Sequence, residues 1–257
     1  MRRLHLFEFE DQSWFPATLR RGMTNYLAAA YGLTPFPKLW AERLATLMKP
    51  EEVSQIVDLG SGSGGPTRRV VKALEESGYR PRVLLTDLYP DNAVQPSEGP
   101  IQYWPDPVDA SNVPTELAGV RTMFASFHHF GPAAAKSILR DAFTRRRPLG
   151  IFEATSRTPR AVATSLVIPI LVLLLTPTIR PVSWLQILFT YLIPVLPLVI
   201  FWDGLISQFR TYSVGDLREL TSDLQAPDYG WEIGVIQIPR LPEGVPYLIG
   251  RPSGIPK

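Results

Sequence analysis

Short apolar runs alternate with amphipathic stretches along most of the chain. An apolar run bounded by Gly, Pro or charged residues is typical of a buried strand, and apolar residues about three to four apart are typical of a helix. The strands predicted in this way cover residues 54–59, 82–87, 101–104, 122–127, 149–154, 231–238 and 245–249. The predicted helices cover residues 13–31, 37–48, 66–77, 133–144 and 214–224.

The order of these elements predicts the fold class. Strands that alternate with helices form parallel sheets with helical crossovers, whereas the last two strands follow each other without a helix and predict an antiparallel hairpin at the sheet edge. We therefore expect an α/β fold, a Rossmann-like doubly wound sheet with mostly parallel strands and an antiparallel edge hairpin. Pro66 suits the first turn of a helix, and Ser213 with Asp216 predicts the start of the last one.

One block interrupts this pattern. Residues 161–202 contain a single charged residue, Arg180. At ~1.5 Å per residue, the uncharged runs on either side of it could each cross, or nearly cross, a hydrocarbon layer of ~30 Å, but several prolines argue against two straight helices. We predict an apolar helical hairpin with its turn at Arg180. It either crosses or dips into a membrane, with Trp184, Tyr191 and Trp202 as interfacial anchors, or packs as a lid on a soluble protein.

Composition narrows the class of protein. The chain has 257 residues, 45% of them hydrophobic, and a net charge of only +2, which excludes a disordered chain and gives no sign of nucleic-acid binding. The absence of cysteine excludes disulfides, thiolate zinc sites and iron–sulfur clusters. With three histidines in all, we expect no metal site.

Two sequence features bear on localisation. Glu8, Glu10 and Asp11 interrupt what would be the apolar part of an export signal. Basic residues precede the apolar block at 145–147, Arg157 and Arg160, as expected where a chain enters a membrane from the cytoplasm. We expect a membrane-associated protein with its catalytic domain in the cytoplasm, or alternatively a soluble cytoplasmic protein.

The first predicted strand leads directly into a glycine-rich turn. Gly60, Gly62 and Gly65 satisfy the pattern G-x-G-x-x-G, which on its own is compatible with a dinucleotide. Glycine permits positive φ and lets a ligand approach the backbone, and open parallel sheets bind ligands at the carboxyl ends of their strands. Asp58, two residues before the first glycine, suits a ligand with a cationic amino group and would oppose a pyrophosphate.

Two further acids follow later strands. Asp87 ends the second strand, where a carboxylate can accept hydrogen bonds from both hydroxyls of a ribose, in a dinucleotide as in other nucleosides. Asp109, followed by Ala110, comes after the third strand and can accept a hydrogen bond from an adenine amino group. With Asp58, these acids predict a pocket for an adenosine that carries an amino acid.

These segments resemble the class I S-adenosylmethionine-dependent methyltransferases over about residues 50–155. The run VDLGSGSGG at 57–65 is similar to the first motif of that family, and TDL at 86–88 and Asp109-Ala110 are similar to its second and third cofactor motifs. The resemblance implies S-adenosylmethionine as cofactor. In it Asp58, Gly60 and Gly62 hold the methionine portion, Asp87 holds the ribose, Asp109 the adenine, and Leu88 packs on the adenine face. The implied cofactor-binding residues are Asp58, Gly60, Gly62, Gly64, Asp87, Leu88, Asp109, Ala110 and Phe127.

The segment SFHHF at 126–130 is similar to the one that borders the active site in many small-molecule members of the family. His128 and His129 are therefore candidates for a general base, needed where the methyl acceptor must lose a proton. Because consecutive residues of a strand point to opposite sides, we expect only one of them to face the pocket. Glu153, near the end of the fifth strand, either faces the same cleft or forms a cap or salt bridge.

The resulting division of the chain has four parts. Residues 1–50 form an N-terminal helical cap, 51–157 the Rossmann-like core that binds S-adenosylmethionine, 158–204 the apolar insertion, and 205–257 a C-terminal helix and edge strands that complete the core. The apolar insertion departs from the usual family core. It is expected beside the substrate mouth, which suggests a lipophilic acceptor.

The predicted function is methyl transfer from S-adenosylmethionine to a small, lipophilic acceptor, with membrane lipid as a further partner. One alternative is an NAD(P)-dependent reductase that uses the same glycine turn, although no Tyr-x-x-x-Lys pair is present. The other alternative is a non-catalytic membrane protein that retains a methyltransferase-like fold.

Overall fold

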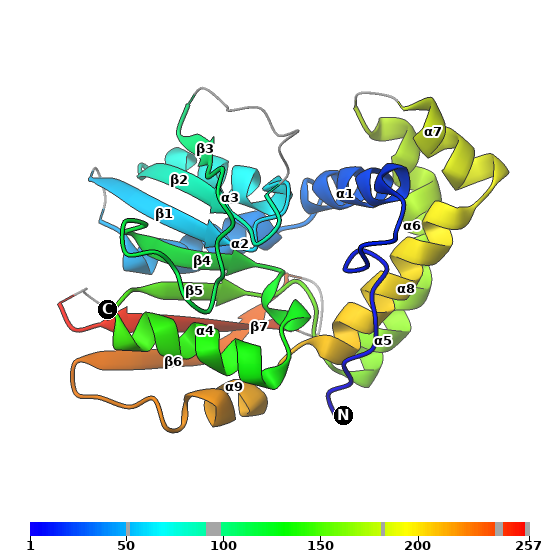
Figure 1. Cartoon of the computed structure of the whole chain (residues 1–257). Helices are drawn as coiled ribbons and strands as arrows, with labels where there is room; N and C mark the ends of the chain where they lie inside the picture. The colour runs from blue at the N-terminus through cyan, green and yellow to red at the C-terminus, as the bar shows by residue number, and fades with distance from the viewer. Residues whose placement is uncertain (50–51, 91–98, 181–182, 240–243, 255–257) are drawn as a thin grey trace. The chain divides into compact units, whose positions relative to one another are not determined.

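The computed structural model describes residues 1–49, 52–90, 99–180, 183–239 and 244–254 (Figure 1). The chain divides into two units, each built from two separate segments. The helical unit consists of Met1–Thr34 and Thr155–Thr211, and the sheet unit consists of Pro35–Ala154 and Tyr212–Lys257. The helix predicted over 37–48 therefore belongs to the sheet unit.

Within the described residues of the sheet unit, seven strands form one sheet in the order β3-β2-β1-β4-β5-β7-β6. The strands are β1 (Val53–Leu59), β2 (Arg80–Thr86), β3 (Ile101–Tyr103), β4 (Val120–Phe124), β5 (Leu149–Phe152), β6 (Tyr229–Gln237) and β7 (Gly244–Pro252). Strands β1 to β5 are parallel, and β7 runs antiparallel to both β5 and β6. The predicted fold class is confirmed, including the antiparallel edge pair.

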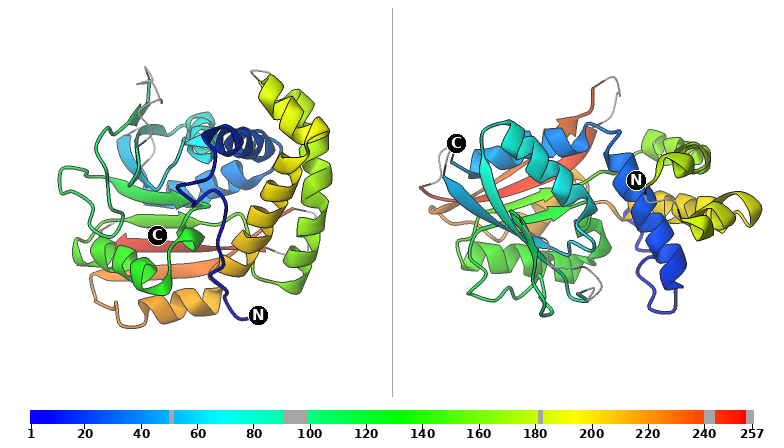
Figure 2. Two further views of the ribbon diagram at one scale, coloured as in Figure 1. Left: turned by 45° about the vertical axis from the view of Figure 1, so that its right-hand side comes forward. Right: turned by 90° about the horizontal axis from the view of Figure 1, so that it is seen from above.

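Helices cover both faces of this sheet (Figures 1 and 2). They are α2 (Phe36–Leu44), α3 (Gly65–Glu76), α4 (Pro132–Thr144) and α9 (Val214–Thr221). On the face of α2 and α3, the Trp40 ring stacks on Phe124, which stacks on Phe152, with centroid distances of 5.6 and 5.5 Å. On the opposite face, buried residues of α4 and α9 form one apolar cluster with residues of β1, β4, β5 and β7. The sheet is therefore the middle layer of three.

The predicted helix starts in this unit are confirmed. Pro66 lies in the first turn of α3. Ser213 caps α9 in a capping box, in which its hydroxyl accepts the Asp216 N–H and the Asp216 carboxylate accepts the Ser213 N–H. Such a box satisfies backbone donors that a helix leaves without intrahelical partners.

The predicted end of the fourth strand is wrong. Strand β4 ends at Phe124, because Ala125 has a φ of +50°, which breaks the extended backbone. Residues Phe127–His129 instead form a turn of 3₁₀ helix. The rule that neighbouring strand residues point to opposite sides therefore does not apply to His128 and His129, whose ring centroids are 4.3 Å apart.

The helical unit contains α1 (Ala17–Tyr31), α5 (Pro159–Thr164), α6 (Ile168–Leu175), α7 (Trp184–Ile187) and α8 (Val195–Arg210). One short 3₁₀ segment joins α5 to α6 and another follows α6, so that together they form one helix, Pro159–Thr178. The predicted second arm of a hairpin is bent by 82° between Trp184–Leu192 and Val195–Arg210. The turn predicted at Arg180 borders residues 181–182, which lie outside the described residues. Among the described residues, the helix Pro159–Thr178 is long and apolar enough to cross a membrane. The bent segments Trp184–Leu192 and Val195–Arg210 would be a second candidate if together they formed one membrane-spanning segment.

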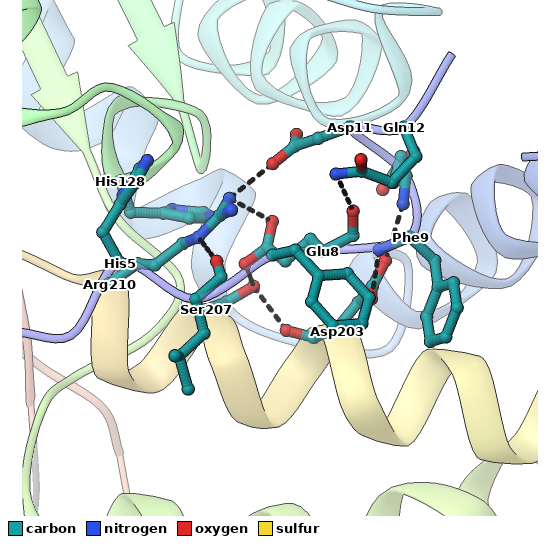
Figure 3. Close-up of polar contacts among 12 residues, drawn as sticks. His5, Glu8, Phe9, Asp11, Gln12, His128, Asp203, Ser207 and Arg210 are labelled. Carbon is teal, nitrogen blue, oxygen red and sulfur yellow. Dashed lines mark hydrogen bonds and ion pairs between the residues drawn. The ribbon is translucent and has the colours of Figure 1, made fainter. Parts of the chain in front are cut away.

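A polar network binds the N-terminal segment to α8 within the helical unit (Figure 3). The Asp203 carboxylate accepts hydrogen bonds from the Phe9 and Glu10 N–H groups at 2.8 and 2.9 Å. The Arg210 guanidinium pairs with the Glu8 carboxylate at 3.0 Å and with that of Asp11. Burial raises the pKa of Asp203 to about 6, although the two N–H donors oppose the shift. Two of the acids that interrupt an export signal, Glu8 and Asp11, therefore tie the N-terminal segment to Arg210 of α8.

Candidate active site

Four segments with candidate site residues meet at one edge of the sheet. Strands β1, β2, β4 and β5 are parallel, so their carboxyl ends lie at the same edge. The glycine turn follows β1, Asp87 follows β2, the histidine turn follows β4 and Glu153 follows β5. Strand order reverses between β1 and β4, which is where open α/β sheets bind their ligands.

The glycine turn depends on backbone conformations that side chains disfavour. Gly60, Gly62 and Gly64 have φ values of +61°, +51° and +71°. A Cβ at Gly64 would lie 2.5 Å from a methyl carbon of Leu85, so this glycine serves the packing of α3 on the sheet. A Cβ at Gly62 would meet no atom within 4 Å. The space beside the Gly62 Cα is therefore open to a ligand.

Asp87 is joined directly to this turn. Its Oδ2 accepts the Gly62 N–H at 2.9 Å and its Oδ1 accepts the Tyr89 N–H at 3.0 Å. Each carboxylate oxygen has a further lone pair, so the half-buried group can still accept hydrogen bonds from a ligand. The Tyr103 hydroxyl at the end of β3 donates to the Gly62 carbonyl at 3.1 Å. Tyr103 was not anticipated, because nothing in its local sequence distinguishes it from other strand residues.

Asp58 lies beneath the turn and is 1% exposed. Its two carboxylate oxygens accept hydrogen bonds from the Thr67 and Thr122 hydroxyls. Burial raises the pKa of Asp58 to about 7, although both threonines oppose the shift. Direct contact between Asp58 and a ligand stays a prediction, since both oxygens already face threonines from α3 and β4.

The other predicted cofactor residues differ in their exposure. Leu88 is 48% exposed beside Asp87, whereas Ala110 is buried. The Asp109 Oδ1 accepts hydrogen bonds from the N–H and hydroxyl of Ser111, as an aspartate often does in a turn. Phe127 is 1% exposed and its ring packs 5.3 Å from that of Tyr212, so its side chain belongs to the core. The roles predicted for these residues stay predictions.

Glu153 fixes His128 through two hydrogen bonds. Its Oε1 accepts the His128 N–H at 2.9 Å, and its Oε2 lies 2.8 Å from the His128 Nδ1. Glu153 is 3% exposed. A buried carboxylate at this distance favours the tautomer with a proton on Nδ1 and the lone pair on Nε2. Glu153 is therefore the hydrogen-bonding partner of a candidate base.

No protein-family model and no curated protein sequence is significantly similar to the chain. Solved structures are similar to it. The plantazolicin methyltransferase BpumL in complex with SAH superposes with a TM-score of 0.57 at 12% identity, covering 95% of this chain and 94% of that one. Human N-acetylserotonin methyltransferase in complex with SAM superposes with a TM-score of 0.52 at 12% identity, covering 92% of this chain and 56% of that one. The chain has the fold of these methyltransferases.

The methyltransferase fold accounts for where the candidate residues meet. It brings Gly62 together with Asp87, and His128 together with Glu153, at the carboxyl ends of neighbouring parallel strands. At 12% identity the similarity establishes the fold and leaves the ligand and the reaction to be argued from the residues of this chain.

Proposed function

We propose that this protein is an S-adenosylmethionine-dependent methyltransferase that acts on a small, lipophilic acceptor. The observation that carries the proposal is the direct hydrogen bond from the open Gly62 backbone to Asp87, where strand order reverses. It supports a site for a nucleoside that contacts the turn through its backbone and Asp87 through its ribose. The solved methyltransferases of the same fold with bound SAH or SAM add support.

The residues present fit this cofactor. S-adenosylmethionine supplies an electrophilic methyl group on a positively charged sulfonium. In the proposal, Gly60 and Gly62 hold the methionine portion, Asp87 accepts the ribose hydroxyls, Leu88 packs on the adenine and Asp109 accepts its amino group. A dinucleotide could also place a ribose on Asp87, so the preference for S-adenosylmethionine comes from the solved structures of the same fold that contain SAH or SAM.

His128 is the proposed general base. Glu153 holds its ring with Nδ1 toward the carboxylate, so that Nε2 can take a proton from an acceptor hydroxyl as the oxygen attacks the methyl group. The chain otherwise has to align the acceptor with the methyl group and exclude water. His129, whose ring lies beside that of His128, is a candidate for contact with the acceptor.

The nature of the acceptor is inferred from the helical unit. Residues 161–202 carry one charge, and many of their large apolar side chains are exposed. We propose that this unit associates with a membrane, that the sheet unit lies in the cytoplasm, and that the acceptor reaches the protein from the lipid phase. Tritium from methyl-labelled cofactor should then appear in the organic phase of a reaction with a cell lipid extract.

Replacing Asp87 tests the cofactor site. Asp87→Ala should weaken SAH binding by about 10- to 100-fold, because a carboxylate hydrogen bond is worth roughly 1.5–3 kcal/mol. Asp106→Ala removes an exposed acid from the loop after β3 and should leave the affinity unchanged. Calorimetry with SAH measures both. Equal affinity in both variants, or binding of NADPH instead of SAH, would contradict the proposal.

A further inference from the structure

Between residues 166 and 175 the helix Pro159–Thr178 is apolar on every side, and much of this stretch is exposed. Only 22% of its most apolar window is buried. One side of α6 packs into the helical unit through Val172, which joins an apolar cluster with Phe15, Met23 and Tyr26. The other side exposes large aliphatic side chains. A helix that is apolar all round is normally enclosed by protein or by lipid.

The exposed side chains form a defined surface, which we call the aliphatic face. Its members on the helix Pro159–Thr178 are Leu166, Val167, Ile170, Leu171, Leu173 and Leu174, which are 39–68% exposed. Their spacing places most of them on one side of the helix. Further along the helical unit, Trp184 is 70% exposed, Tyr191 46% and Leu192 77%. Monomeric soluble proteins rarely expose so many large apolar residues in one segment.

The charges around this face have one sign. Between Glu153 and Asp203 the sequence contains no acidic residue, whereas it contains Arg157, Arg160 and Arg180. Arg160 and Arg180 are exposed and flank the helix at its two ends. An apolar surface bordered by cations complements anionic headgroups above acyl chains. Exposed Trp and Tyr side chains are also typical of the membrane interface.

We propose that the aliphatic face docks the protein on a bilayer that contains anionic lipids. In this arrangement the helix Pro159–Thr178 lies in the plane of one leaflet and does not cross the bilayer. A protein partner suits this face less well, because protein interfaces carry roughly one hydrogen bond per 100–200 Å² and the aliphatic side chains of α6 have no hydrogen-bonding groups. This proposal rests on the membrane association proposed above. It adds which face of the protein contacts the bilayer, that the contact is limited to one leaflet, and which lipid charge favours it.

The rest of the helical unit favours the in-plane arrangement over a crossing. The inward side of α6 shares its apolar cluster with α1, and α1 carries Arg20 and Arg21. Gly22, Met23 and Tyr26 are the buried residues of α1, while Arg21 and Ala17 are exposed. A crossing helix surrounded by lipid would bring this charged helix into the hydrocarbon, which is costly. Docking by one face leaves α1 in water.

Vesicle flotation of the whole chain tests the proposal. Wild-type protein should float with vesicles of 70% phosphatidylcholine and 30% phosphatidylglycerol, and at least tenfold less with phosphatidylcholine alone. The double variant Leu166→Glu/Leu174→Glu should bind the mixed vesicles at least tenfold more weakly. The matched control Val53→Glu/Val235→Glu changes two exposed valines of the sheet unit and should bind as the wild type does.

The cysteine-free sequence permits a clean measurement of depth. A polarity-sensitive NBD label on Ile170→Cys should shift to the blue and brighten when mixed vesicles are added. The same label on Ala17→Cys, on the exposed side of α1, should not respond. A response at both positions would indicate that the unit is embedded in lipid and would overturn the in-plane arrangement.

The remaining outcomes are also decisive. Failure to float with either vesicle would overturn membrane docking. If, in addition, the wild type sediments as a dimer and Leu166→Glu/Leu174→Glu as a monomer, the face is an interface between two copies. SAH affinity in these variants is independent of vesicle binding, so a failure here is distinguishable from a failure of the proposed methyltransferase function.

Discussion

Asp58 is a buried carboxyl group whose ionisation works against folding. Its pKa is about 7, against 3.8 in the unfolded chain, mainly because burial disfavours the charged form. The folded state therefore holds the proton more tightly than the unfolded state. The protonated Asp58 contributes its full stabilisation of the folded state below pH about 4. This contribution is lost as the pH rises to about 7, which lowers the free energy of unfolding by on the order of 4 kcal/mol at most.

Asp58→Asn should remove this dependence. The amide can hydrogen-bond to Thr67 and Thr122 without carrying a charge, so the free energy of unfolding should fall less between pH 4 and 7 than it does in the wild type. Urea unfolding at several pH values in this range measures the slope. The exposed variant Asp106→Asn serves as control. Equal slopes in wild type and Asp58→Asn would contradict the assignment.

The pairing of His128 with Glu153 predicts a single tautomer. Glu153 accepts from both the backbone N–H and the ring of His128, and Glu153→Gln leaves one oxygen for two donors. Nitrogen-15 spectra of the three histidines should show Nδ1 protonated for His128 in the wild type and less so in Glu153→Gln. SAH affinity should not change, and turnover should fall about tenfold or more. A wild-type His128 protonated on Nε2 would rule out its proposed orientation.

At the scale of elements, the glycine turn combines structural and binding roles that one control can separate. Gly62 and Gly78 both have positive φ, at +51° and +86°, and a Cβ at either would meet no atom within 4 Å. Gly62→Ala and Gly78→Ala should therefore each cost about 1–2 kcal/mol of stability. SAH binding should weaken at least tenfold in Gly62→Ala alone, as calorimetry would show. Equal SAH affinity in the two variants would remove Gly62 from the cofactor site.

Most elements of the sheet unit could be predicted from the sequence, because each is specified locally. Periodicity indicates β1 and α4, and the residues at Pro66 and Ser213 mark helix starts. The end of β4 could not be predicted, because Ala125 has a positive φ and alanine is not a residue type that indicates this conformation in a sequence. The 82° bend before α8 could not be predicted either. Proline indicates that a helix breaks at that point, but it does not determine the angle of the break.

The candidate site residues that come directly after predicted strands could be placed together from the sequence. The glycine turn and Asp87 stand directly after strands, so their meeting at one edge follows from a parallel sheet. The pairing of Asp58 with Thr122 and of His128 with Glu153 depends on register between distant segments. Glu153 is 25 residues from His128, and only the pairing of β4 with β5 brings their ends together.

At the scale of the whole molecule, the proposed chemistry is confined to one unit. The glycine turn, Asp87, Asp109, His128 and Glu153 all belong to the sheet unit, whereas the aliphatic face belongs to the helical unit. A chain in which residues 35–154 are joined to 212–257 by a flexible linker should therefore fold and bind SAH. Circular dichroism and calorimetry measure both properties, with Asp87→Ala in the same shortened chain as control. A folded shortened chain without SAH affinity would show that the helical unit contributes to the site.

The central claim is that the glycine turn and Asp87 hold S-adenosylmethionine, and equilibrium dialysis of the whole chain against methyl-tritiated cofactor tests it most directly. The account predicts saturable binding of about one molecule per chain that unlabelled SAH displaces and NADPH does not. Absence of saturable binding, or displacement by NADPH, would contradict it.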